Sequence, residues 1–275
     1  MHLHISNNLR VSGYPLPLKL KIVDDLTMDN PAYLKAKYQR RPTWGIDQKL
    51  QLFTYDNDGS LILPRGYLKQ LQEHLQGMKV TYSVDEVEGH PVDFGPWNDS
   101  YKIRDYQRPL IDALVHENGI GVAPAGSGKT IMGMRYILET GRPTLWLTHT
   151  KDLMYQTRDR ATATLLGVGK VGILGDGCQD MGDGKLIIAT VQTLKANPAL
   201  VDKLKNYVGV VVIDEAHHFP STQFLDTAAQ FKAKRMIGLT ATPKRKDELE
   251  EFMYKGKLIT SFASSQKMQA GWYFF

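Results

Sequence analysis

The chain has 275 residues, of which 42% are hydrophobic and 23% are charged, and its formal net charge is +5. This length and composition are typical of a globular protein with two domains, or with one large α/β domain and an appendage. No apolar stretch approaches the roughly 20 residues of a membrane-spanning helix, and the first residues lack the layout of a secretory signal, so we expect no membrane partner. The single cysteine, Cys178, excludes an internal disulfide and favours a reducing cytoplasm.

The positive charge is concentrated in the second part of the chain. Residues 1–100 carry 11 Lys and Arg against 12 Asp and Glu, whereas residues 101–275 carry 23 against 17. A basic excess suits a polyanionic partner such as a nucleic acid. Solvated surface lysines are the alternative explanation of the same excess.

Residues 1–95 predict a small α+β accessory domain. Two β-rich segments, 49–55 and 60–64, flank the turn 56–59 and indicate a hairpin, and Leu68, Leu71 and Leu75 have helical spacing. The segment 89–100 is rich in Gly, Pro, Asn and Asp and predicts a linker or turn region. Four aromatic residues are candidates for stacking on nucleic-acid bases, although we expect most of them to be buried: Trp44, Tyr55, Tyr67 and Trp97.

Residues 96–275 predict an α/β domain with a mainly parallel sheet. Short apolar runs occur at 119–123, 144–149, 185–190, 208–213 and 235–240, and helix-like segments such as 131–140 and 151–166 lie between them. This alternation indicates βαβ units whose sheet is covered on both faces. The glycine-rich stretch 172–185 predicts a strand and a hairpin-like turn. Ligands of such sheets bind beyond the carboxyl ends of the strands, so the residues that follow each run are candidates for function.

The sequence APAGSGKT, residues 123–130, follows the first run and precedes a helix. It matches the phosphate-loop pattern G-x-x-x-x-G-K-[ST] except at Ala123, where the pattern has glycine. Its glycines allow backbone N–H groups to point at phosphate oxygens, and the helix adds the positive end of its dipole. We expect the loop to bind nucleotide through Ala125, Gly126, Ser127, Gly128, Lys129 and Thr130, with Lys129 reaching the β- and γ-phosphates and Thr130 binding Mg²⁺.

The apolar run at 208–213 is followed by Asp214 and Glu215. An acidic helix start is one explanation of such a pair. Because the pair follows a strand in a chain that also carries a phosphate loop, we favour catalysis: Asp214 holds Mg²⁺, and Glu215 orients and deprotonates the attacking water.

Together these motifs resemble those of the superfamily 2 helicases. APAGSGKT, DEAHH (214–218) and GLTATPKR (238–245) resemble motifs I, II and III, and RDYQ (104–107) resembles the Q motif. THTKDLMYQ (148–156) and ATVQTL (189–194) resemble motif Ia and the Ib/Ic region. The resemblance covers about residues 101–260 and is greatest to the DNA-repair and branch-remodelling group that includes XPB and UvsW. It implies a RecA-like fold and ATP with Mg²⁺ as cofactors.

The resemblance also implies roles for further residues. Gln107 would bind the adenine edge, Arg104 would line the same pocket, and Tyr101 would stack on the base or serve as an ordinary linker aromatic. The residues that would couple nucleotide state to the nucleic-acid groove are His217, Thr240 and Thr242. The residues that would contact nucleic-acid phosphates are Thr148, Thr150, Thr190, Gln192 and Thr193.

We therefore expect an ATP-dependent DNA helicase or translocase that acts on single-stranded, forked or branched DNA in the cytoplasm of a bacterium or phage-infected host. Superfamily 2 motors clamp ATP between two RecA-like lobes, and we expect the second lobe to come from a missing C-terminal half or from a partner chain. Two alternatives are the motor subunit of a restriction or remodelling complex and a nucleotide-gated nucleic-acid-binding module. RNA remains an alternative substrate, because contacts to phosphates do not read the 2′-hydroxyl.

Overall fold

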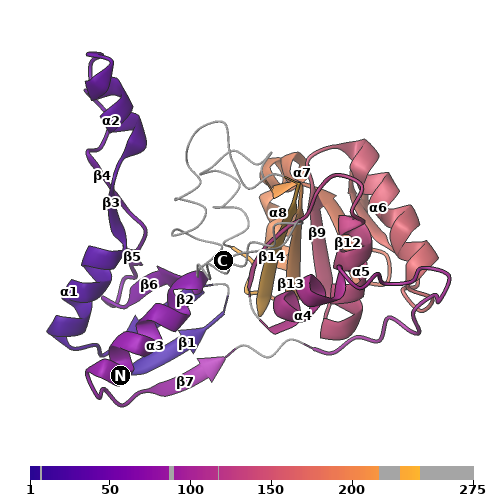
Figure 1. Ribbon diagram of the computed structural model, residues 1–275, viewed down its shortest axis with the longest axis horizontal. Coiled ribbons are helices and arrows are strands. Elements are labelled where there is room, and N and C mark those ends of the chain that lie inside the picture. The colour runs from indigo at the N-terminus through magenta and orange to yellow at the C-terminus, as the bar shows by residue number, and fades with distance from the viewer. Residues whose placement is uncertain (7, 87–89, 117, 217–229, 242–275) are drawn as a thin grey trace. The chain divides into compact units, whose positions relative to one another are not determined.

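Figure 1 shows the computed structural model of the chain, which describes residues 1–6, 8–86, 90–116, 118–216 and 230–241. The described residues form two compact units, one that ends at Glu86 and one that follows it. Among these residues, no helix combines the length and the apolar character needed to cross a membrane.

The first unit contains a five-stranded sheet with strand order β5-β6-β2-β1-β7. Its strands are β1 (His2–Ile5), β2 (Asn8–Ser12), β5 (Thr54–Tyr55), β6 (Leu61–Pro64) and β7 (Ser83–Glu86). Strands β5 and β6 pair antiparallel around the predicted turn, so the predicted hairpin is confirmed. Neighbouring strands in the sheet are antiparallel except β1 and β7, which are parallel.

Helices and a small ribbon complete the first unit. The helices are α1 (Leu16–Asp25), α2 (Pro31–Tyr38), the 3₁₀ turn η1 (Arg65–Tyr67) and α3 (Leu68–Gly77). Strands β3 (Thr27–Asp29) and β4 (Lys49–Gln51) form a separate two-stranded antiparallel sheet. Helix α3 confirms the predicted leucine periodicity, because Leu71 and Leu75 are buried in the core that α1, α3 and the larger sheet share. Such one-sided burial is what stabilises a short amphipathic helix.

The second unit contains a seven-stranded sheet with strand order β11-β10-β12-β9-β13-β14-β8. Its strands are β8 (Gly119–Val122), β9 (Thr144–Thr148), β10 (Gly172–Gly175), β11 (Cys178–Asp180), β12 (Leu186–Thr190), β13 (Val210–Asp214) and β14 (Arg235–Thr240). All neighbours are parallel except β10 and β11, which form the predicted hairpin. Every residue of β8, β9, β12 and β13 is buried, which explains why these strands appear in the sequence as unbroken apolar runs.

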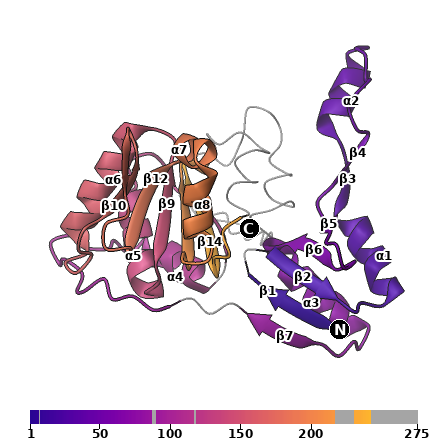
Figure 2. The ribbon, with the colours of Figure 1, turned by 180° about the vertical axis from the view of Figure 1, so that it is seen from behind.

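Helices cover both faces of this sheet. They are α4 (Arg108–His116), α5 (Lys129–Thr140), α6 (Lys151–Thr164), α7 (Val191–Ala196) and α8 (Pro198–Leu204). Figures 1 and 2 show α4, α5 and α6 on one face and α7 and α8 on the other. The predicted doubly covered parallel sheet is thus confirmed.

The segment that we predicted as a linker is irregular, but it packs on the second unit. Phe94 is 1% exposed within the core of that unit, and its carbonyl accepts a hydrogen bond from Gly167 N at 2.8 Å. A Cβ at Gly95, whose φ is +70°, would lie 2.5 Å from Gly167 N. Gly and Pro therefore mark a close backbone approach here, and the units divide after Glu86 instead of near residue 95.

Candidate active site

The loop from Ala123 to Gly128 leaves the end of β8 and begins α5. Its two glycines, Gly126 and Gly128, have φ of 77° and 84°, a left-handed conformation that favours glycine. Ala123 N donates to Thr240 O of β14 at 2.9 Å, so the start of the loop is fixed to the neighbouring strand end. This geometry turns the loop over the amino end of α5, where backbone N–H groups and the helix dipole attract anions.

Gln107 and Tyr106 bind the loop from the side. Gln107 is buried, its Nε2 donates to Ser127 O at 2.8 Å, and its Oε1 accepts from Arg104 N at 2.9 Å. The Tyr106 hydroxyl donates to the same Ser127 carbonyl at 3.0 Å, and Arg104 donates to that hydroxyl at 2.9 Å. A primary amide has two N–H groups and two acceptor positions, so these two bonds use one of each on Gln107. The RDYQ segment therefore fixes the phosphate loop, and adenine recognition by Gln107 stays a prediction.

The structure brings Lys129, Asp214 and Glu215 together. Lys129 Nζ lies 3.6 Å from Glu215 Oε1 and donates to Ala123 O at 3.3 Å, and the lysine side chain is only 8% exposed. Asp214 ends β13, is 5% exposed, and accepts a hydrogen bond from Glu215 N at 3.0 Å. Glu215 has φ of 48°, which is strained for a residue with a side chain. Strain of this kind is often concentrated where a side chain must point at a reaction centre.

Burial makes the Asp214 carboxylate costly to ionise. Desolvation, followed by the adjacent Glu215 carboxylate, raises the pKa of Asp214 to about 6. The Glu215 N–H, the Trp146 indole and the Lys129 charge act in the opposite direction and limit the rise. A bound cation would remove the penalty, because it stabilises the ionised form of the acid.

Trp146 joins the phosphate-loop helix to the acidic strand. It lies fully buried on β9, next to β13, and its indole lies close enough to Asp214 to favour the ionised carboxylate. On its other side it packs on Gly133 of α5, where an added Cβ would lie 2.4 Å from the ring. The contact was not predicted from the sequence. The sequence did contain one signal for it: Gly133 lies inside a helix, where alanine is favoured, and such a glycine often indicates that another side chain packs against the helix backbone.

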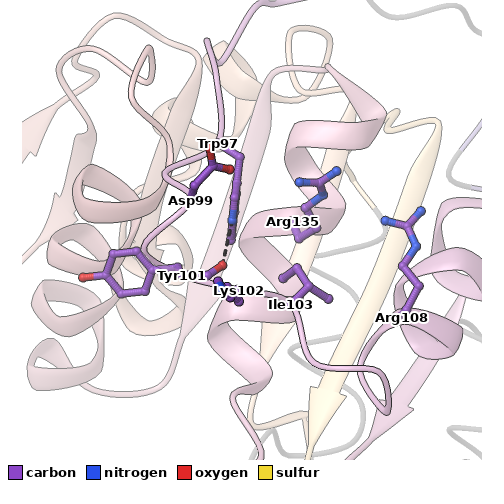
Figure 3. A pocket seen from close by; sticks show the side chains of 7 residues that line it. All are labelled: Trp97, Asp99, Tyr101, Lys102, Ile103, Arg108 and Arg135. Atoms are coloured by element: carbon purple, nitrogen blue, oxygen red, sulfur yellow. Dashed lines mark hydrogen bonds between the residues drawn. The ribbon is translucent and has the colours of Figure 1, made fainter.

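Tyr101 lies in a different pocket from Gln107. The pocket has a volume of about 450 Å³ and is lined by Trp97, Asp99, Tyr101, Lys102, Ile103, Arg108 and Arg135. Trp97 Nε1 donates to Tyr101 O at 2.8 Å, and Arg135 lies 5.5 Å from the centre of the Trp97 ring. Figure 3 shows the Tyr101 ring pointing away from Arg108 and Arg135, and the Arg160 guanidinium lies 5.7 Å from that ring. Neither Arg104 nor Gln107 lines this pocket, so stacking of Tyr101 on an adenine held by Gln107 has no support in this arrangement.

The predicted nucleic-acid contacts lie at the carboxyl ends of β9 and β12, which are adjacent. Thr148 pairs with Thr190 across the two strands, and the Thr190 and Thr193 hydroxyls are 2.8 Å apart. Gln192 Nε2 donates to His149 O at 3.2 Å, and Thr150 Oγ1 caps α6 by accepting from Leu153 N. The two strand ends therefore form one polar edge, on the far side of β13 from the phosphate loop. Thr148 and Thr190 are buried, so only the exposed members of this edge are accessible to a large ligand.

Of the three predicted coupling residues, only Thr240 lies within the described residues. It ends β14, pairs with Val122 at the start of the phosphate loop, and is 2% exposed. His217 and Thr242 lie outside the described residues, as do the basic residues 244–246.

The groups present fit a magnesium–triphosphate ligand. A Cβ at Gly126 would meet nothing within 4 Å, so the loop leaves open space for phosphate oxygens. The Ser127 hydroxyl is buried and has no hydrogen-bond partner among the described residues. These residues also contain no cluster of three or more His, Cys, Asp or Glu. A divalent ion here would therefore be held jointly by Thr130, Asp214 and phosphate oxygens, as is usual for Mg²⁺.

The fold and the site together define a RecA-like P-loop domain of the superfamily 2 helicase type. The chain belongs to the family described as "Type III restriction enzyme, res subunit", which its residues 100–245 match.

Two relatives are DNA helicases or translocases by name. The chain is 32% identical over 170 residues to "DNA 3'-5' translocase XPB2" of Sulfurisphaera tokodaii, which covers 60% of this chain and 37% of that protein. It is 28% identical over 216 residues to "DNA 3'-5' helicase XPB" of Mycobacterium tuberculosis, which covers 71% of this chain and 36% of the relative. The chain thus spans little more than a third of the length of these relatives.

Among solved structures, the UvsW helicase of bacteriophage T4 resembles both units. The match has a TM-score of 0.64 and covers 93% of this chain and 98% of the UvsW chain. Because the sequences are only 16% identical, the match shows a shared fold and no more.

Proposed function

We propose that this chain binds ATP and Mg²⁺ as the first RecA-like lobe of a DNA helicase or translocase. The observation that carries the proposal is the approach of Lys129 Nζ to Glu215 Oε1, 3.6 Å apart, at the strand ends where the phosphate loop and the acidic pair meet. A P-loop lysine close to an acidic pair is a recurring arrangement of phosphoryl-transfer sites.

Each residue has a separate role in this proposal. The backbone from Ala125 to Thr130 holds the β- and γ-phosphates, and Lys129 adds a positive charge to them. Thr130 and Asp214 would hold Mg²⁺, which when bound neutralises charge on the phosphate oxygens. Burial of Asp214 and Lys129 keeps water from screening these charges.

Glu215 is the proposed general base. Its carboxylate lies beside Lys129 and its side chain is 25% exposed, so a water molecule can reach it. Glu215 would orient this water and accept its proton while the water oxygen attacks the γ-phosphorus. The bond from that phosphorus to the β–γ bridging oxygen would break, so that ADP leaves and phosphate is released. The positive φ of Glu215 supports this role, because backbone strain is often concentrated at residues of a reaction centre.

Thr240 is the proposed link to the nucleic-acid groove. It lies on the strand between those that carry Asp214 and the phosphate loop, and its carbonyl holds the loop through Ala123 N. A change in the contacts to the γ-phosphate would therefore move the phosphate loop and, through this hydrogen bond, the end of β14. His217 and Thr242 are proposed partners in this relay, and Thr150, Gln192 and Thr193 are proposed phosphate contacts on the DNA path.

Efficient hydrolysis requires a further cation at the γ-phosphate. An arginine finger is typically worth about 10³ to 10⁵ in rate. We assign it to a second RecA-like lobe. Support comes from the match to the Sulfurisphaera tokodaii relative, of which this chain covers 37%. The 275 residues alone are then expected to bind nucleotide and to hydrolyse it slowly.

DNA is the proposed substrate class, with forked or branched molecules preferred. Support comes from the names of the relatives, which describe 3'-5' DNA helicases and translocases. The family description supports the motor subunit of a restriction complex as a second candidate. A cytoplasmic location in a bacterium or phage-infected cell stays a prediction.

The test is the steady-state ATPase rate of the protein together with its second lobe, measured with single-stranded, forked and four-way DNA and with RNA. We expect DNA to stimulate the rate, forked DNA to stimulate it most, and Lys129→Ala to abolish it. A rate that no nucleic acid changes would refute the motor and favour a nucleotide-gated binding module. Stimulation by RNA alone would refute DNA as the substrate.

A further inference from the structure

The first unit carries an extension whose side chains remain outside its core. We name residues 30–49 the arm; it comprises Asn30, α2, the loop that returns to β4 and the first residue of that strand, Lys49. Figures 1 and 2 show α2 beyond the β3–β4 ribbon, away from the five-stranded sheet. The core of the first unit is built from other segments and includes no residue of the arm.

Two aromatic side chains of the arm are almost fully exposed. Trp44 is 96% exposed and Tyr38 is 91% exposed, and Leu34 on the same helix is 49% exposed. We expected most of the four candidate stacking residues to be buried, and this is wrong: only Tyr67 is buried, whereas Tyr55 is exposed like Trp44, and Trp97 of the second unit is half-buried. Aromatic rings of this size normally contribute to a core or an interface, so their exposure on one short segment indicates a binding surface.

The arm is also strongly basic, although the net charge of the whole unit is close to zero. Residues 30–49 hold five cationic side chains against one carboxylate, that of Asp47. The cationic residues are Lys35, Lys37, Arg40, Arg41 and Lys49. The rest of the unit, residues 1–29 and 50–86, holds six Lys and Arg against eight Asp and Glu. The near-neutral total of residues 1–100 is therefore the sum of a basic arm, an acidic body and the acidic segment 87–100.

The cations of the arm have no acidic partner within the described part of the unit. Among the described residues, none of the five is held in an ion pair, whereas Arg10 of the same unit pairs with both Asp56 and Asp58. All five side chains are exposed. Charges placed in this way are accessible to a polyanion, and their neutralisation is the usual source of affinity for a nucleic-acid backbone.

The arm is held in a defined shape by its own hydrogen bonds. Asn30 caps α2 by accepting from Ala32 N at 3.0 Å, and Asn30 Nδ2 donates to Asp47 O at 2.7 Å, which ties the two ends of the arm together. At the base of the ribbon, Leu52 N donates to Leu26 O at 2.8 Å, and both leucines are buried in the unit's core. The aromatic rings and cations are thus presented on an ordered support, which limits the entropy lost on binding.

We propose that the arm binds DNA, with its lysines and arginines on phosphates and with Tyr38 and Trp44 stacked on unpaired bases of a fork or branch. The inference rests on the proposed function, because it takes the motor's substrate as its ligand. Cations interspersed with exposed aromatic rings are the combination that single-stranded nucleic acid requires, since every base offers a face for stacking. An acidic protein surface would use the cations but has no equivalent need for two exposed rings.

The proposal is tested by equilibrium binding of the complete protein to fluorescently labelled forked DNA at several salt concentrations. The aromatic variant carries Tyr38→Ala and Trp44→Ala, and the charge variant carries alanine at Lys35, Lys37, Arg40 and Arg41. The matched control carries Lys21→Ala and Lys69→Ala, two exposed lysines of the same unit outside the arm. Circular dichroism checks that all variants keep the wild-type fold.

We expect the aromatic variant to bind forked DNA at least about 30-fold more weakly, because each of the two stacked bases contributes roughly 1–3 kcal/mol and about 1.4 kcal/mol corresponds to tenfold in affinity. The charge variant is expected to lower the steepness of the log–log salt dependence by about 3, given about 0.7 to 0.9 per phosphate contact. The control should bind like the wild type. Cross-linking of bromouracil-substituted single strands to residues 38–44 would provide a second, direct readout.

The possible results distinguish a failure of this inference from a failure of the proposed function. If the wild type binds forked DNA and both arm variants bind it equally well, the inference is refuted while the proposed function stands. If the wild type binds no DNA at any salt concentration, the proposed function fails and the inference fails with it. Unchanged DNA binding by the arm variants, together with loss of binding to an acidic protein, would assign the arm to a protein partner and overturn the proposal.

Discussion

Replacing Asp214 by asparagine should make the second unit more stable and at the same time inactive. In the folded protein the carboxylate is 5% exposed, and burial raises its pKa from the ordinary value of 3.8 to about 6. An ionised acid in this place is therefore a cost to folding at neutral pH. Asparagine has nearly the same shape and removes the charge without creating a cavity.

The magnitude follows from the pKa difference. Each pKa unit corresponds to about 1.4 kcal/mol, so a rise from 3.8 to about 6 corresponds to roughly 3 kcal/mol. The folded-state pKa is higher than the unfolded one, so protonation of Asp214 adds stability that is fully present below pH 3.8 and is lost as the pH rises through about 6. The advantage of Asp214→Asn should accordingly be near zero at acidic pH and reach about 3 kcal/mol above pH 7.

The assay is urea unfolding of both proteins at a series of pH values without nucleotide or Mg²⁺. Asp202→Asn is the matched control, because its side chain is 65% exposed and its pairing with Lys205 is a surface contact, for which we expect a change of about 0.5 kcal/mol or less. An Asp214→Asn protein that is less stable than the wild type at pH 7, or a difference that does not change with pH, would refute this reasoning.

Two further substitutions test the supports of the site. Gly133→Ala should destabilise the protein by about 1–3 kcal/mol, because the new Cβ would lie 2.4 Å from the Trp146 ring, whereas Gly77→Ala meets nothing within 4 Å and should be nearly neutral in the same urea assay. Equal effects of these two substitutions would contradict the packing argument. Gln107→Ala should raise the KM for ATP by about 10-fold with a smaller change in kcat, because the amide bond of 2.8 Å to Ser127 O that holds the phosphate loop is lost. A KM equal to that of the wild type would show that the loop does not need this support.

The sheet of the second unit was predictable because its strands are buried on both sides. Runs such as residues 208–213 are apolar throughout, and short apolar runs that alternate with helix-like segments are typical of strands in a covered parallel sheet. The placement of Lys129, Asp214 and Glu215 at one edge followed in turn, since the carboxyl ends of parallel strands lie on the same side. Their distances could not be predicted, because they depend on the strained backbone at Glu215.

Local sequence patterns could not predict the contacts between segments that are distant in the sequence. The segment 89–100 has the composition of a linker, yet Phe94 belongs to the core of the second unit, because a single buried ring decides its packing. The exposure of Trp44 was missed for the opposite reason. An aromatic residue predicts burial on average, and nothing in the local sequence says that the arm extends away from the core.

The positive charge of the arm was also missed, because the net charge was summed over too long a segment. Summed over residues 1–100, the balance is nearly neutral, and that sum argues against a nucleic-acid surface. Only the fold shows that the residues of positions 30–49 lie together outside the core, so that their net positive charge acts as one surface.

The central claim is that Lys129 and the acidic pair serve one nucleotide, and equilibrium binding of ATP with Mg²⁺ tests it most directly. Glu215→Gln should bind within about threefold of the wild type and lose turnover, because the base acts only in the chemical step. Lys129→Ala should weaken binding by about 10-fold to 100-fold, which is the value of one charge-assisted contact to phosphate. Full binding by Lys129→Ala, or turnover retained by Glu215→Gln, would contradict the account.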